Sequence, residues 1–129
     1  MKQLSSWEVN LPWVMDFFKG QEYILAGEAT FDDLLDAVVK GEVQVLYQEE
    51  PKLIMLTEIV QYPKRRVLRI LAVIGKGLVN SDPSELEDWA RKRDVEEIEG
   101  WCQAPQARLF RRLGYETRYT VVRKSLRSH

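Results

Sequence analysis

The chain has 129 residues, of which 45% are hydrophobic, and its formal net charge is −1. This size and composition suffice for one hydrophobic core without disulfides or metal ions, and the near-zero charge argues against nucleic acid or an anionic membrane as a partner. The single cysteine, Cys102, excludes a disulfide within the chain, and the single histidine, His129, excludes Ser-His-Asp triads, Cys-His dyads and histidine-rich metal sites.

The first 29 residues predict an N-terminal arm and one amphipathic helix. Residues 1–8 are expected to form a short edge strand or an extended arm. Asn10 has the side chain of a helix N-cap, and apolar residues follow at the spacing of one helix face: Leu11, Val14, Met15 and Phe18. Trp13 and Phe17 widen this apolar surface, which we interpret as core, with a subunit or partner interface as the alternative.

A second helix is predicted between Thr30 and Gly41. Thr30 and Asp33 have capping-box spacing, and Gly41 stands where a helix C-terminal cap belongs. The buried stripe comprises Phe31, Leu34, Leu35 and Val38. The aspartates near the start of this helix are explained by its dipole and predict no metal site.

Three strands should follow, at Val43–Gln48, Leu53–Tyr62 and Val67–Ile74, with a turn at Pro63–Arg66. The long apolar runs of the last two predict central strands that are covered on both faces.

The second half predicts two helices that alternate with strands. Asp82 as N-cap and Pro83 at the first position begin one helix, which should bury Leu86, Trp89 and Ala90. The remaining elements are expected to be a strand at Val95–Trp101, a helix at Pro105–Leu113 and a final strand at Thr117–Lys124.

Charge is unevenly distributed along the chain. Residues 1–60 hold four Lys/Arg and eleven Asp/Glu, a net −7, whereas residues 61–129 hold fifteen and nine, a net +6. We favour two solvated faces of opposite sign, although such halves also allow copies to associate head to tail. Three basic residues share one side of the last helix, where we favour a solvated face over a phosphate or acidic partner: Arg108, Arg111 and Arg112.

The last quarter of the chain carries a family resemblance. A helix opens at Pro105, ends at Gly114 and leads through Tyr115 toward a strand. With the long hairpin before it, this pattern resembles the GNAT (N-acetyltransferase-like) fold family over about residues 30–126. The resemblance implies a fold of the α/β (α+β) class, with a mixed, mostly antiparallel central sheet and helices on both faces. Residues 1–129 would form one GNAT-like domain, with 1–29 as N-terminal arm and helix and 30–126 as its core.

More narrowly, the chain resembles small GNAT-like proteins of tailed bacteriophages. The segments that carry this likeness are Thr57–Pro63, Arg66–Ile70 and Leu113–Tyr115. It implies a structural or assembly (internal virion) component that contacts other proteins or further copies of itself. Since the sequence has no apolar run of about 20 residues and no signal-peptide pattern, we expect it in the host cytoplasm or inside a phage virion.

The residues that the family uses for catalysis are altered. In the GNAT pattern, a tyrosine four residues before the glycine protonates the departing thiolate of coenzyme A. That position is Phe110 here, and Ala104 replaces the usual asparagine before the proline. The resemblance therefore implies a catalytically degenerate protein. The alternative is an acetyl-CoA-dependent N-acetyltransferase for an unknown amine, with Glu58 as candidate base and Tyr115 as candidate hydroxyl donor.

The family's phosphate-binding loop, Arg/Gln-x-x-Gly-x-Gly/Ala, is only partly present. The matching residues, candidates for cofactor binding, are Val73, Gly75, Lys76 and Gly77. Backbone N–H groups at such a loop and helix N-terminus bind anions, but Leu78–Ser81 intervenes before Asp82, a carboxylate where phosphates need donors. We therefore favour a simple turn and expect no cofactor, with coenzyme A or acetyl-CoA under the alternative.

Overall fold

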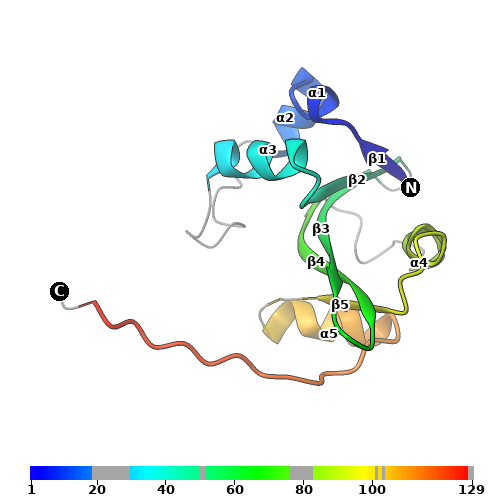
Figure 1. The fold of residues 1–129 in the computed structure, drawn as a ribbon, viewed down its shortest axis with the longest axis vertical. Helices are drawn as coiled ribbons and strands as arrows, with labels where there is room; N and C mark the ends of the chain where they lie inside the picture. The colour runs from blue at the N-terminus through cyan, green and yellow to red at the C-terminus, as the bar shows by residue number, and fades with distance from the viewer. Residues whose placement is uncertain (19–29, 50–51, 76–82, 101, 103, 128–129) are drawn as a thin grey trace.

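The chain folds around a five-stranded sheet whose strands follow the order β1-β2-β3-β4-β5 (Figure 1). A computed structural model describes residues 1–18, 30–49, 52–75, 83–100, 102 and 104–127. The strands are β1 (Lys2–Leu4), β2 (Gln44–Gln48), β3 (Leu53–Gln61), β4 (Arg66–Gly75) and β5 (Glu97–Gly100). The helices are α1 (Ser6–Val9), α2 (Pro12–Phe18), α3 (Phe31–Val39), α4 (Pro83–Arg91) and α5 (Ala104–Arg112). Neighbouring strands are antiparallel except β4 and β5, which are parallel.

The N-terminal arm is an edge strand, because β1 pairs with β2 from Lys2 opposite Tyr47 onward. The prediction that Asn10 caps the following helix is wrong. Asn10 is instead the C-cap of the short helix α1. The N-cap of α1 is Ser5, whose N–H donates to Oε1 of Glu8 at 3.1 Å. This is a capping-box contact. Helix α2 starts instead at Pro12, which suits a first turn because it needs no N–H partner.

Helix α3 has the predicted caps. Thr30 Oγ1 accepts from the Asp33 N–H at 3.2 Å, and Asp33 Oδ2 accepts from the Thr30 N–H at 2.8 Å. The hydrogen bond from the Thr30 N–H, followed by a smaller contribution from the Thr30 side chain, lowers the pKa of the Asp33 carboxyl. Gly41 follows the helix with φ +76°, the left-handed conformation that glycine adopts without strain.

The central hairpin forms as predicted. Strands β3 and β4 pair antiparallel, and the Tyr62 N–H donates to the Arg65 carbonyl at 2.8 Å across the turn. The sequence did not reveal a β-bulge: Leu56 lies opposite Ala72 but Thr57 lies opposite Ile70, so Leu71 is an extra residue. Because side chains alternate between faces with a period of two, this extra residue resets which side chains of β4 face which core.

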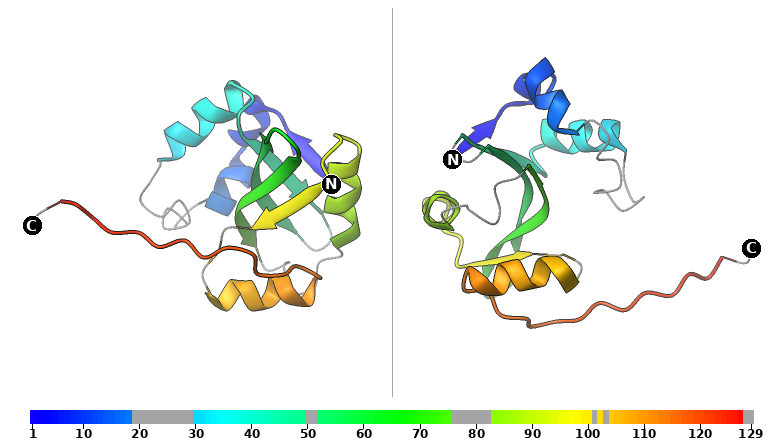
Figure 2. Two further views of the ribbon diagram at one scale, coloured as in Figure 1. Left: turned by 60° about the horizontal axis from the view of Figure 1, so that its bottom comes forward. Right: turned by 180° about the vertical axis from the view of Figure 1, so that it is seen from behind.

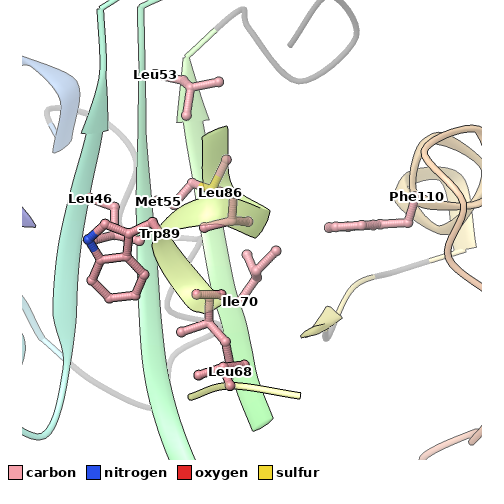
Figure 3. Close-up of a cluster of buried hydrophobic side chains, with 10 residues drawn as sticks. Leu46, Leu53, Met55, Leu68, Ile70, Leu86, Trp89 and Phe110 are labelled. Atoms are coloured by element: carbon pink, nitrogen blue, oxygen red, sulfur yellow. The ribbon is translucent and has the colours of Figure 1, made fainter. Parts of the chain in front are cut away.

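Helices cover both faces of the sheet (Figure 2), and a separate core of buried side chains lies on each face. One core joins the sheet to α4 and α5 through Leu86, Trp89 and Phe110 (Figure 3). The other joins it to α1, α2 and α3 through Val9, Val14 and Leu34. Trp7 and Trp13 remain 68% and 41% exposed, although Phe17 packs against the second core.

The predicted final strand at Thr117–Lys124 is wrong. Residues 116–127 form no strand and run as an exposed, extended tail away from the body (Figures 1 and 2). Tyr119 and Val122 are 78% and 89% exposed. Strand propensity reflects packing against neighbours, and the strand that a returning chain would join, β5, is only four residues long. The predicted N-cap Asp82 and the predicted strand end Trp101 lie outside the described residues.

Candidate functional site

The parallel pair β4–β5 defines the candidate site. The two strands pair only from Val67 opposite Glu97 to Ile70 opposite Gly100. Beyond that point β4 continues from Leu71 to Gly75, while no strand among the described residues lies on this edge. The bulge at Leu71 stands where the pairing stops. An unpaired strand edge offers backbone donors and acceptors to an extended chain that contains amides.

Phe110, which the sequence resemblance aligns with the acid of the GNAT pattern, lies beside the last residue of β5. Its ring points from α5 toward the sheet (Figure 3), and the residue is 8% exposed. A Cβ built on Gly100 would lie 2.9 Å from Phe110 Cζ, so the ring touches the last residue of β5. Phe110 is therefore a core residue with no proton to donate. Ala104, the other altered position, is the first residue of α5.

Tyr115 is the hydroxyl-bearing residue nearest to this ring in the described contacts. Its ring meets Phe110 edge-on, with centroids 5.0 Å apart, and packs against the core under α4 and α5. Burial, with a smaller contribution from Glu87, raises the pKa of Tyr115 to about 12. The phenol therefore stays protonated at neutral pH. Tyr119, by contrast, lies in the exposed tail.

Glu58, the candidate base, belongs to a charged network that sequence reasoning missed. Arg69 Nη1 donates to Glu58 Oε1 at 2.8 Å, and Arg69 Nε donates to Glu99 Oε1 at 2.7 Å. Arg69 Nη2 also donates to the Tyr62 hydroxyl at 2.8 Å. Burial alone would lower the pKa of the Arg69 guanidinium, but hydrogen bonds and charge from Glu99, then Glu58, raise it. Three strands are thus tied by one guanidinium.

The two candidate catalytic residues lie on opposite faces of the sheet. Ile59, the neighbour of Glu58 in β3, packs against the same core as Tyr115 and Phe110. Because adjacent strand residues point to opposite faces, Glu58 points away from that core. The structure therefore does not bring Glu58 and Tyr115 together as an acid–base pair. The alternation of Glu58, Arg69 and Glu99 with apolar neighbours is the signal that could have predicted the network.

The residues predicted to bind a cofactor are only partly described. Val73 lies in β4 and packs against the core under α4 and α5. Gly75 has φ +117°, and a Cβ there would approach the Lys52 carbonyl oxygen to 2.7 Å. Close contact with the start of β3 therefore explains this glycine without a phosphate. Lys76 and Gly77 lie outside the described residues.

The remaining polar features give no catalytic centre. Arg108, Arg111 and Arg112 are exposed on α5, and Arg111 Nη1 donates to Thr117 Oγ1 at 3.1 Å. Partial burial raises the pKa of the Cys102 thiol, against an opposing effect of Arg111, so the thiol is not activated. Within the described ranges, no cluster of three His, Cys, Asp or Glu could hold a metal ion, and none of the helices has the length and apolar character to cross a bilayer.

An open hollow of about 430 Å³ lies away from the β4–β5 junction. It is lined by Lys2, Leu4, Trp13, Tyr47, Glu49 and Lys52. Trp13 and Tyr47 meet edge-on there, with ring centroids 4.9 Å apart. Since Leu4 and Tyr47 contact the core under α1–α3, this hollow is on the side of the sheet opposite Phe110.

Solved acetyltransferases have the same fold. No family model matches the chain, and no curated protein matches its sequence. An aminoglycoside acetyltransferase from an uncultured soil metagenomic sample, solved with sisomicin, is 12% identical with a TM-score of 0.66, over 98% of this chain and 95% of its own. A predicted acetyltransferase from Clostridium acetobutylicum, solved with acetyl-CoA, is 9% identical with a TM-score of 0.64, over 97% and 94% of the two chains. A tetramutant of the BH1408 protein from Bacillus halodurans is 13% identical with a TM-score of 0.59, over 97% and 98%.

The chain therefore has a GNAT-type acetyltransferase fold. The expected mixed, mostly antiparallel sheet with helices on both faces is confirmed. At these identities the likeness concerns the arrangement of strands and helices, and the activity has to be argued from the residues themselves.

Proposed function

We propose that this GNAT-fold protein is catalytically degenerate and acts through protein–protein contacts. The observation that carries the proposal is Phe110: an apolar ring, packed against Gly100, fills the place of the general acid. The second catalytic candidate, Glu58, is held by Arg69 on the opposite face. A general acid and a general base must both lie within hydrogen-bond reach of the reacting groups, whereas Phe110 has no proton to donate and Glu58 is paired with Arg69 on the other face of the sheet.

The described residues fit coenzyme A only in part. The edge of β4 at Leu71–Gly75, which has no partner among the described strands, suits an extended chain with amides. A bound acetyl-CoA would supply the activated acetyl group. However, Phe110, which is packed against Gly100, has no proton to give to the leaving thiolate.

Exposed aromatic residues support a role in contacts. Trp7 on α1 is 68% exposed, and Trp13 on α2 borders the hollow beside Tyr47. Large aromatic residues contribute disproportionately to protein interfaces. We propose an assembly component, and the sequence likeness to small phage proteins favours a place inside a bacteriophage particle.

The alternative function is acetyl-CoA-dependent N-acetylation of an unknown amine. The β4 edge that lacks a partner among the described strands favours it, and so does the acetyl-CoA complex of a structural neighbour. Under this alternative, Tyr115 would donate the proton, since its phenol stays protonated at neutral pH.

A turnover assay separates the two functions. We expect no thiol release from acetyl-CoA by the wild-type protein with a panel of primary amines. Under the alternative, wild type would turn over, Tyr115→Phe would abolish the rate, and Phe110→Tyr would raise it by about 10²–10⁴-fold, the usual contribution of a general acid. Amine-dependent turnover that Tyr115→Phe removes would therefore overturn the proposal.

A further inference from the structure

The C-terminal tail, residues 116–127, begins beside β5 and then leaves it. Arg118 Nη1 donates to Glu97 Oε2 at 2.8 Å, which holds the start of the tail against the first residue of β5. Beyond this contact the chain extends away from the body (Figure 2). Tyr119, Val121, Val122 and Leu126 are all exposed.

The tail has the composition of a strand but pairs with none of the described strands of its own chain. Tyr119–Val122 reads Tyr-Thr-Val-Val, residue types enriched in strands. Nine extended residues after Arg118 reach about 30 Å, far enough to reach a neighbouring molecule. An extended apolar segment of this kind is a liability unless something covers it.

Strand β5 offers the complementary feature. It is the last strand of the sheet, and its edge away from β4 has no partner among the described strands. One side chain of β5, Ile98, packs against the core, so the edge is fixed in place.

The charges of the two segments are complementary. Around β5 lie the acidic residues Asp94, Glu96, Glu97 and Glu99, and along the tail lie the basic residues Arg118, Arg123, Lys124 and Arg127. The Arg118–Glu97 pair shows that this edge accepts a guanidinium from the tail. Such complementarity fixes register and speeds association between copies.

We propose that residues 119–124 of one copy add as a strand to the free β5 edge of a second copy, and that two copies exchange tails reciprocally. Backbone hydrogen bonds would give the affinity, and the exchange would bury the exposed apolar residues of both tails. A reciprocal exchange forms a closed two-fold dimer. This tail exchange rests on the proposed function, which calls for a protein partner, and it names a second copy of the chain as that partner.

Light scattering on full-length variants tests the exchange. Val121→Pro combined with Val122→Pro removes two backbone donors from the tail, and it cannot disturb the body because both side chains are exposed. We expect dimeric wild type and a monomeric proline variant with an unchanged circular dichroism spectrum. The control, Val121→Ile with Val122→Ile, keeps strand propensity and should stay dimeric.

Hydrogen exchange distinguishes exchange between copies from folding back within one copy. Protection of the Tyr119–Lys124 amides should rise with protein concentration, and it should fall at high salt as the charge complementarity is screened. A monomer at all concentrations, a dimer that survives the proline pair, or protection independent of concentration would each overturn the exchange. A monomer without acetyl-CoA turnover would overturn the tail exchange and leave the proposed function intact. A tail-dependent dimer that turns over acetyl-CoA would overturn the proposed function and leave the tail exchange intact.

Discussion

Gly100 and Phe110 are in direct contact: a Cβ on Gly100 would lie 2.9, 3.1 and 3.2 Å from three carbons of the Phe110 ring. The last residue of β5 is thus fitted to an aromatic ring on the following helix. This contact gives Phe110 a structural role, because its ring holds α5 against the sheet.

The Gly100–Phe110 contact predicts that Gly100→Ala destabilises the protein. The new methyl group would overlap a buried ring that has little room to move, and overpacking of this kind costs about 1–3 kcal/mol. Urea unfolding measures the change. The double variant Gly100→Ala with Phe110→Leu should recover part of the loss, because leucine is smaller at the point of overlap. A fully tolerated Gly100→Ala would contradict the contact.

The Arg69 network predicts that replacing Arg69 lowers the free energy of unfolding more than replacing an exposed arginine does. Arg69→Met leaves the carboxylates of Glu58 and Glu99 near each other without their shared donor, and we expect a loss of about 1–3 kcal/mol. The matched control is Arg91→Met, whose exposed ion pair with Asp88 should be worth less than about 0.5 kcal/mol. Equal effects of the two substitutions in thermal unfolding would show that the network does not join the strands.

Tyr115 predicts a loss of stability at alkaline pH. Its pKa is raised from the ordinary 10.0 to about 12, so the folded state favours the neutral phenol. The resulting contribution to stability is fully present below the ordinary pKa and is lost as the pH rises through about 12. Phenolate absorbance should show one late-titrating tyrosine in the wild type. Tyr115→Phe should remove that late titration and reduce the loss of stability at alkaline pH. A late-titrating tyrosine that persists in Tyr115→Phe would contradict the assignment of the raised pKa to Tyr115.

Local signals in the sequence predicted much of the fold. The Thr30 capping box, the Pro63 turn and the apolar face of α4 each depend on residues close in sequence, and each is confirmed. The strand bounds at β2, β3 and β4 differ from the predicted ones by one residue.

Features that depend on distant partners were not predictable in the same way. The bulge at Leu71 depends on how β3 and β4 align, and the network of Arg69 requires that three strands be in register. The tail was predicted as a strand from its composition, but no strand among the described residues pairs with it. For the site, the assignment of Phe110 to the position of the acid stays a prediction, whereas the placement of Glu58 and Tyr115 on opposite faces required the sheet.

Calorimetric titration with acetyl-CoA tests most directly whether the chain is a degenerate GNAT-fold protein. Each lost phosphate contact costs about 1.5–3 kcal/mol, and two move a micromolar site to about the millimolar range. With the phosphate-loop pattern incomplete in the sequence, we predict no binding heat at micromolar protein and cofactor. A micromolar dissociation constant, with one cofactor per chain, would contradict the central claim and establish the chain as a coenzyme A-binding protein.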